Sequence, residues 1–136
     1  MSLYVLDTDT LQLYQDGNPK VVGRVSAVAP RDRAISVMTV EEQLSGWYTQ
    51  LRQAKSSEKL AWAYRRLAAT VRFLARIEIV DFDEPAIQRY EQLKKLKLKL
   101  RKMDLRIGAI ALENNAAVVT RNRQDFERIP GLAIED

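Results

Sequence analysis

The sequence predicts an α/β protein built around a parallel β-sheet. Two observations indicate this class: short apolar runs rich in β-branched residues recur along the 136 residues, and longer segments with helical periodicity separate them. Strands that alternate with helices in this way are typical of parallel sheets. The length fits one domain with one substantial core, so we expect residues 1–136 to form a single domain.

The first third of the chain divides at its turn signals. The apolar run LYVLD predicts a strand at residues 3–7, and a helix is expected from Thr10 to the Gly-Asn-Pro sequence that follows it. A second helix is expected in residues 21–30, where a proline ends it. The run AISVMTV at residues 34–40 is rich in strand-forming residues and predicts the second strand.

The rest of the chain continues the alternation. Residues 41–54 and 58–76 read as two long helices separated by Lys-Ser-Ser, and we expect them to form a protruding helical hairpin. The remaining predicted elements are a strand at residues 77–82, a helix that opens at Asp83 and runs into a basic stretch, a helix at residues 104–114 and a strand at residues 116–120.

The composition excludes several kinds of chemistry. The chain has no histidine and no cysteine, which removes imidazole bases, serine–histidine triads, thiol chemistry and zinc sites with nitrogen and sulfur ligands. Hydrolysis would therefore depend on carboxylates, hydroxyls, basic side chains and a metal that prefers oxygen. The net charge of +4 favours an anionic partner only weakly. Without an apolar leader or a long apolar stretch, we expect a cytoplasmic protein with no membrane partner.

Carboxylates follow the predicted strands at points that should meet at one edge of the sheet. Asp7 and Asp9 end the first strand, Glu42 follows the second, Asp104 opens a helix, and Asp125 lies in the loop after the last strand. In open α/β sheets, ligands collect outside the carboxyl ends of the strands. Carboxylates gathered there repel one another unless protons or a cation compensate, and Mg²⁺ or Mn²⁺ would suit this set of oxygen ligands.

Each acidic residue also has a purely structural interpretation. Thr39 and Glu42 fit a capping box, with the threonine as N-cap. Asp104 could simply cap its own helix, and Asp9 could cap the helix that begins with TLQLY. The aspartates on either side of Phe82 fit a strand end and a helix cap, so we leave them out of the site. Asp7 resists this interpretation, because a carboxylate at the inner end of an apolar strand is costly to bury without a partner.

Four segments together resemble a known family. VLDTDTL, TVEEQLSG, KMDLRIGAIAL and AAVVTRNRQDFERIPGL are similar, in order and spacing, to the PIN-domain nucleases, and most of all to the VapC toxins of bacterial toxin–antitoxin pairs. The first two motifs are weak alone, whereas the last two in succession are much more specific. The resemblance covers essentially the whole chain and implies a three-layer α/β/α PIN-like fold.

The resemblance also implies roles for individual residues. Asp7 and Asp104 would be the central metal ligands, and Glu42, four residues before Gly46, matches the second acidic position. The fourth position varies in the family, and both Asn122 and Asp125 lie near it. We assign Asp125 as the fourth acid; the supporting polar groups are then Thr120 and Asn122.

The activity that the resemblance implies is an endoribonuclease that cuts single-stranded or structured RNA, such as the loops of transfer RNA, with Mg²⁺ or Mn²⁺. One or two ions would activate water and stabilise charge on the phosphoryl oxygens. Asp7 and Asp104 would hold the metal, while Glu42 and Asp125 position water or a second ion. The resemblance also implies a cognate VapB-like antitoxin that covers the site, and a homodimer.

A basic strip precedes the third motif. Its side chains could bind RNA phosphates or simply form a solvated helix face; they are Lys94, Lys95, Lys97, Lys99, Arg101 and Lys102. The intervening leucines mix helical and alternating spacing, so we expect the helix to break near Lys97. Arg121 and Arg123 flank the fourth acidic position and could also contact phosphates.

Two other functions are compatible with parts of the sequence. LDTDT matches the D-x-D-x-T opening of haloacid-dehalogenase phosphatases, in which Asp7 would be the nucleophile and Asp9 the acid and base. The acidic pair that this class needs after a later strand is missing from AAVVTRNRQDF. A catalytically silent module that binds RNA or protein is the second alternative, and the retained carboxylates argue against it.

Overall fold

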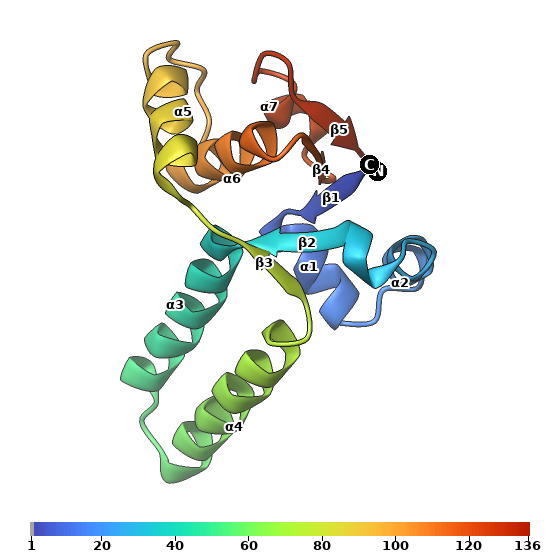
Figure 1. Cartoon of the computed structure of the whole chain (residues 1–136). Helices are drawn as coiled ribbons and strands as arrows, with labels where there is room; N and C mark the ends of the chain where they lie inside the picture. The colour runs from blue at the N-terminus through green and yellow to red at the C-terminus, as the bar shows by residue number, and fades with distance from the viewer. Residues whose placement is uncertain (1) are drawn as a thin grey trace.

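A computed structural model describes residues 2–136 and shows a central sheet of parallel strands (Figure 1). The strand order is β3-β2-β1-β4-β5, and every neighbouring pair is parallel. The strands are β1 (Leu3–Leu6), β2 (Arg33–Ser36), β3 (Glu78–Val80), β4 (Ala116–Val119) and β5 (Ala133–Glu135). The predicted parallel α/β class is therefore confirmed.

Helices connect consecutive strands. They are α1 (Thr8–Gln15), α2 (Pro19–Ser26), α3 (Val37–Gln53), α4 (Ser57–Leu74), α5 (Glu84–Lys94), α6 (Lys102–Glu113) and α7 (Arg123–Phe126), with a short 3₁₀ turn at Pro30–Asp32. Within residues 2–136, none of these helices is long and apolar enough to cross a membrane.

Two apolar clusters, one on each face of the sheet, make up the core. Val5 belongs to the cluster formed with α5 and α6, whereas the next residue, Leu6, belongs to the cluster formed with α1, α2 and the end of α4. Alternate residues of a strand point to opposite faces, so β1 contributes to both clusters. This arrangement is the three-layer α/β/α fold that the resemblance implied (Figure 1).

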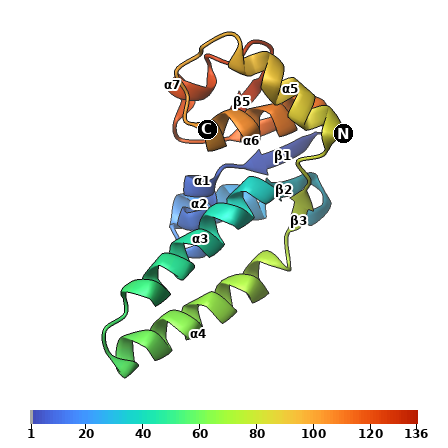
Figure 2. The same cartoon turned by 90° about the vertical axis from the view of Figure 1, so that its left-hand side faces the viewer.

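Helices α3 and α4 form an antiparallel hairpin that extends away from the sheet (Figure 2). The ring centroids of Trp47 and Trp62 lie 5.4 Å apart in an edge-to-face arrangement across the hairpin, and Arg66 lies over the Trp47 ring. Much of the aromatic surface here stays exposed, including Trp62 and Tyr64. The expected protruding hairpin is confirmed.

The helix boundaries differ from the predicted ones at two strand ends that matter for the site. Only residues 33–36 of the second β-rich run form a strand, and Ser36 caps α3 by accepting a hydrogen bond from the Thr39 N–H. The predicted capping box with Thr39 as N-cap is therefore wrong. Helix α1 begins directly after Asp7, which is its N-cap in place of the predicted Asp9.

The basic strip is not helical between the end of α5 and the start of α6 at Lys102. Lys97 and Lys99 have positive φ values of 53° and 62°, and the chain between them and α6 is irregular, so the expected break near Lys97 is confirmed. Leu98 and Leu100 pack against the core and anchor this segment, while Arg128 donates a 3.0 Å hydrogen bond to the Lys99 carbonyl. The lysines are consequently left exposed on a fixed piece of backbone.

Candidate active site

The order of the sheet creates a crevice at the carboxyl end of β1. From β1 the chain adds β2 and then β3 on one side, and it returns to add β4 and β5 on the other. Ligands of open α/β sheets bind where the strand order reverses in this way. Asp7 follows β1 and Thr120 follows β4, so both residues lie at this point of reversal.

Asp7 is a buried carboxylate, with 4% of its surface exposed. Its Oδ1 accepts a 2.9 Å hydrogen bond from the Thr10 N–H, and its own N–H donates to the Val119 carbonyl. Burial raises the pKa of Asp7 above its ordinary value, and the polar groups of Thr10 and Thr120 beside it offset only part of this effect. The site therefore holds a carboxylate whose charge the surrounding protein does not fully stabilise.

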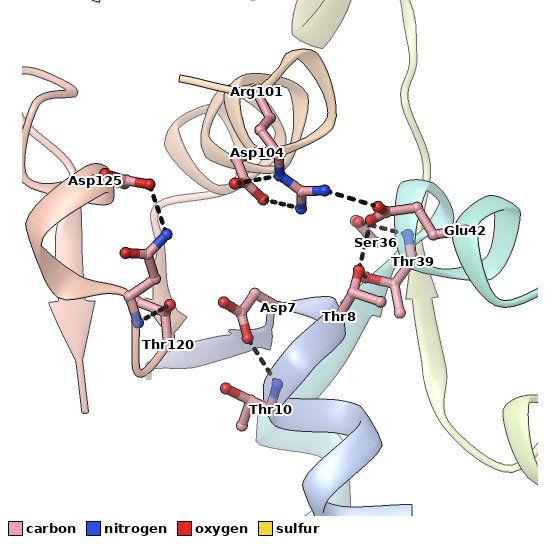
Figure 3. Close-up of polar contacts among 11 residues, drawn as sticks. Asp7, Thr8, Thr10, Ser36, Thr39, Glu42, Arg101, Asp104, Thr120 and Asp125 are labelled. Carbon is pink, nitrogen blue, oxygen red and sulfur yellow. Dashed lines mark hydrogen bonds and ion pairs between the residues drawn. The ribbon is translucent and has the colours of Figure 1, made fainter. Parts of the chain in front are cut away.

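Glu42 lies in the second turn of α3 and is held by the helix that follows Asp7. The Thr8 hydroxyl donates a 2.7 Å hydrogen bond to Glu42 Oε1 and lies 3.0 Å from the Thr39 hydroxyl. Thr8 is the first residue of α1, so the cap at Asp7 also positions the hydroxyl that orients Glu42. Figure 3 shows this chain of contacts from α1 to α3.

Asp104 lies in the first turn of α6 and is bound by the arginine three residues before it. Arg101 donates from Nε to Oδ2 and from Nη2 to Oδ1, each over 3.2 Å. The same guanidinium places Nη1 3.8 Å from Glu42 Oε2 (Figure 3). Asp104 does not cap its helix, whose N-cap is Arg101 without a side-chain capping bond. One cation thus connects two of the predicted ligands.

Asp125 is in the short helix α7, and its two oxygens have separate partners. Asn122 Nδ2 donates a 2.7 Å hydrogen bond to Oδ2, and Arg128 Nη1 lies 3.3 Å from Oδ1. The Thr120 hydroxyl accepts from the Asn122 N–H over 2.8 Å, which fixes the turn between β4 and α7. The two candidates for the fourth acidic position, Asn122 and Asp125, are therefore joined by a hydrogen bond.

The donors at this edge fit a hard divalent cation, although their oxygens are not gathered around one point. Within residues 2–136, no group of three or more acidic side chains is placed closely enough to hold a metal ion. Instead, the Arg101 guanidinium lies between Glu42 and Asp104, so a positive charge occupies the space between two carboxylates. Oxygen donors that already attract a cation, next to a buried carboxylate, have the chemistry that Mg²⁺ or Mn²⁺ requires.

The remaining basic residues differ in whether their side chains are exposed or form ion pairs. Lys95, Lys97, Lys99 and Lys102 are exposed, and within the described residues their side chains form no ion pair at the distances that define one. Arg123 is paired with Glu127 over 2.9 Å, whereas Arg121 is exposed directly after Thr120.

A family model for the PIN domain matches residues 4–132, which is nearly the whole chain. The chain belongs to the PIN-domain family. The match includes every residue that the sequence analysis assigned to the site.

Curated relatives of this PIN domain are VapC proteins. The tRNA(fMet)-specific endonuclease VapC of Salmonella typhimurium is 29% identical over 140 aligned residues, which cover 100% of this chain and 98% of that protein. Ribonuclease VapC1 of Haemophilus influenzae (strain R2866) is 27% identical, with 98% and 97% covered.

Solved structures show the same fold in toxin–antitoxin complexes. The structure described as DNA-bound VapBC from Salmonella typhimurium gives a TM-score of 0.80 at 28% identity, covering 100% of this chain and 98% of the matched chain. VapBC-1 from nontypeable Haemophilus influenzae gives a TM-score of 0.77 at 26% identity, with 98% and 97% covered.

These findings do not favour the phosphatase alternative. In that alternative, Asp7 would be the nucleophile and Asp9 the acid and base. In this PIN domain Asp9 lies in the first turn of α1 and is exposed, whereas Asp7 is buried behind it. The two carboxylates therefore have different surroundings, and the family match points to a nuclease fold.

Two residues of the site were not identified as such from the sequence. Thr8 is the middle residue of the D-x-D pattern and was not considered. A hydroxyl residue directly after the first predicted ligand could have indicated its contact with Glu42. Arg101 was assigned to the basic strip as an RNA contact, and the structure places its guanidinium on Asp104 and Glu42. The i, i+3 spacing of Arg101 and Asp104 could have indicated this pair.

Proposed function

We propose that this chain is a divalent-metal-dependent endoribonuclease toxin of the VapC type. The observation that supports this most is the meeting of Asp7, Glu42 and Asp104 at one sheet edge of a PIN domain, in a chain that has no histidine. Without imidazole, hydrolysis of a phosphodiester at neutral pH needs another way to activate water. Carboxylates with a bound cation provide it.

The carboxylates divide the work between holding the cation and orienting water. Asp7 and Asp104 would hold Mg²⁺ or Mn²⁺, and Glu42 and Asp125 would position the attacking water or a second ion. The cation would acidify a bound water and stabilise charge on the phosphoryl oxygens. Thr8 holds Glu42 in place, and Asn122 does the same for Asp125. Attack by water leaves a 5′-phosphate and a 3′-hydroxyl on the products.

The exposed lysines next to the site suit an RNA substrate. Lys95, Lys97, Lys99 and Lys102 lie on the segment that leads into α6, so phosphates bound there would continue toward Asp104. Arg121 would extend the same surface beyond β4. The Salmonella relative is a tRNA(fMet)-specific endonuclease, which supports a structured RNA such as transfer RNA as the substrate.

The solved relatives support a cognate antitoxin. Those of Salmonella, Rickettsia and Haemophilus were determined as VapBC. We propose that a VapB-like protein binds this chain and inhibits cleavage, and that the reading frame directly upstream encodes a short DNA-binding protein. Homodimerisation is a further prediction from the resemblance.

The proposed activity is tested with purified protein and transfer RNA. We expect cleavage in Mg²⁺ or Mn²⁺, none in excess chelator, and restoration on adding the ion back. Asp104→Asn should abolish cleavage, whereas Asp83→Asn, which changes a helix cap away from the site, should not. Equal cleavage in chelator would overturn the metal-dependent mechanism. Binding of RNA without cleavage under all ion conditions would instead favour the silent binding module.

A further inference from the structure

Arg101 differs from every other cation of the basic strip in where its charge lies. Its guanidinium makes two hydrogen bonds of 3.2 Å to Asp104 and approaches Glu42 to 3.8 Å. The partners are well shielded, since the side chains of Asp104 and Glu42 are 9% and 21% exposed. The Arg101 side chain is 64% exposed, so it reaches into the site from solvent and does not fill space in the core.

A structural ion pair does not account well for this arrangement. The Arg101 side chain makes no helix-capping hydrogen bond, and its exposure means that little packing depends on it. Its partners belong to α3, which follows β2, and α6, which precedes β4, and the two helices come together at the site (Figure 3). Two carboxylates brought together there repel one another unless a positive charge lies between them. Arg101 supplies that charge from within the chain.

We infer that Arg101 is a positioning residue that competes with the divalent cation for Asp104 and Glu42. Arg101 releases these two carboxylates when an RNA phosphate binds its guanidinium. The inference rests on the proposed function, because it concerns the same carboxylates. In the RNA-free protein the guanidinium neutralises the pair. When RNA binds along the strip, a phosphate near its C-terminal end becomes an alternative partner for the same guanidinium.

The competition makes binding of the cation and binding of RNA mutually favourable. A cation that must displace Arg101 binds more weakly, because its apparent affinity is multiplied by the fraction of molecules in which the carboxylates are free. A phosphate that holds Arg101 elsewhere removes this penalty, and linkage requires that the cation strengthen RNA binding by the same factor. Because Arg101 is largely exposed, we expect the factor to be about three- to tenfold.

The direct test measures Mn²⁺ binding by isothermal titration calorimetry on the full chain without RNA. Arg101→Gln should bind Mn²⁺ about three- to tenfold more tightly than wild type, because its competitor is gone. Lys102→Gln loses the same charge one residue away and is the matched control, expected to stay close to wild type. Arg101→Lys keeps the charge but loses the two-donor fork, and it should fall between wild type and Arg101→Gln.

Thermal melts give a second readout that does not depend on catalysis. Without divalent ions, Arg101→Gln should melt at a lower temperature than wild type and Lys102→Gln, because Asp104 and Glu42 lose their counter-charge. On adding Mn²⁺, Arg101→Gln should gain more in melting temperature than wild type, since binding to the native state supplies the stabilisation.

The coupling is tested with a hydrolysis-resistant phosphorothioate RNA oligonucleotide. We expect this oligonucleotide to tighten Mn²⁺ binding to wild type by about the same three- to tenfold factor, and to tighten binding to Arg101→Gln much less. Equal tightening in both proteins would assign the effect to the general field of the RNA and overturn the inference.

Other outcomes separate this inference from the proposed function. If wild type and Arg101→Gln bind Mn²⁺ equally and wild type cuts RNA, the competition is wrong while the nuclease stands. If Lys102→Gln tightens Mn²⁺ binding as much as Arg101→Gln does, a general reduction of positive charge explains the result and the inference is overturned. If neither protein binds Mn²⁺, the metal-dependent function falls together with the inference.

Discussion

The Thr10 N–H donates a 2.9 Å hydrogen bond to Asp7 Oδ1, so the carboxylate that ends β1 also caps α1. The sequence posed these as alternative roles, a structural cap or part of a cation site. The structure makes them compatible, because the capping bond uses one oxygen of a carboxylate that lies at the reversal point of the sheet. Substitutions that preserve the cap can therefore separate the two roles.

Asp7→Asn is expected to keep the fold and lose the activity. The amide oxygen of asparagine still accepts the Thr10 N–H, and a buried charge is removed, so the stability of the metal-free protein should be unchanged or raised. Cleavage of RNA and most of the stabilisation by Mn²⁺ should disappear. Thermal melts with and without Mn²⁺, together with cleavage assays, measure both effects.

Asp83→Asn is the matched control for this change. Asp83 caps α5 by accepting a 3.1 Å hydrogen bond from the Ala86 N–H, and it lies outside the site. We expect the variant to retain cleavage and its response to Mn²⁺. An Asp7→Asn protein that is destabilised without metal and still cuts RNA would show that Asp7 is only a cap.

Asp7 should also give the metal-free protein a distinctive pH dependence. Its pKa is raised from the ordinary 3.8, chiefly by burial, so the folded protein holds the proton more tightly than the unfolded chain. Its contribution to stability is therefore full below pH 3.8 and is lost as the pH rises through the raised pKa. The Asp7→Asn variant should not show this loss of stability as the pH rises.

The comparison is made by urea unfolding of wild type and Asp7→Asn in excess chelator, from about pH 4 to 7. The variant should gain in stability relative to wild type as the pH rises, and the difference should level off above the raised pKa. A difference that shrinks with rising pH would mean that the folded protein stabilises the Asp7 carboxylate.

The sequence was sufficient for the sheet and for the edge where the carboxylates meet. The apolar runs before Asp7 and before Thr120 became β1 and β4, and the rule for parallel sheets placed their ends together. Helix boundaries were less predictable. Ser36 and Thr39 can both cap a helix by their chemistry, and the structure uses Ser36, where β2 ends.

The polar contacts within the site could not be predicted in this way. The Thr8–Glu42 hydrogen bond joins residues 34 positions apart in the sequence. Arg101, which approaches Glu42, belongs to a third segment, directly before α6. Such contacts depend on how α1, α3 and α6 converge on the edge, which local sequence patterns do not encode. The short elements α7 and β5 were missed because four and three residues carry too little periodicity.

Thr8→Val is expected to impair cleavage without unfolding the protein. Valine has nearly the shape of threonine but cannot donate to Glu42 Oε1, so Glu42 would lose its orientation. We expect kcat to fall about tenfold, equivalent to ~1.4 kcal/mol of transition-state stabilisation, while Thr8→Ser retains most of the activity. Single-turnover cleavage at saturating Mg²⁺ measures this effect.

Thr49→Val is a control on the same helix as Glu42. The Thr49 hydroxyl donates to the Ser45 carbonyl on the exposed part of α3 and has no contact with the site. Its loss should leave kcat near that of wild type. If Thr8→Val cleaves as fast as Thr49→Val, the Thr8–Glu42 hydrogen bond has no part in catalysis.

The lysines of the basic strip should determine how strongly salt weakens RNA binding. Lys95, Lys97 and Lys99 are exposed on a segment anchored by Leu98, so replacing all three with glutamine should remove charge without disturbing the core. For a single-stranded ligand, the slope of log affinity against log salt should become shallower by about 2, since each lost phosphate contact contributes ~0.7. Affinity for RNA should fall most at low salt.

Binding is best measured in chelator, where the RNA is not cut, by fluorescence anisotropy over a range of salt concentrations. Replacing Lys55, Lys59 and Arg65 with glutamine removes the same charge at exposed positions on the α3–α4 hairpin, outside the strip. This variant should retain the wild-type slope, because these residues do not border the site. If both triple variants change the slope equally, net charge alone attracts RNA. If neither changes it, the strip is a solvated surface and the RNA binds elsewhere on the domain.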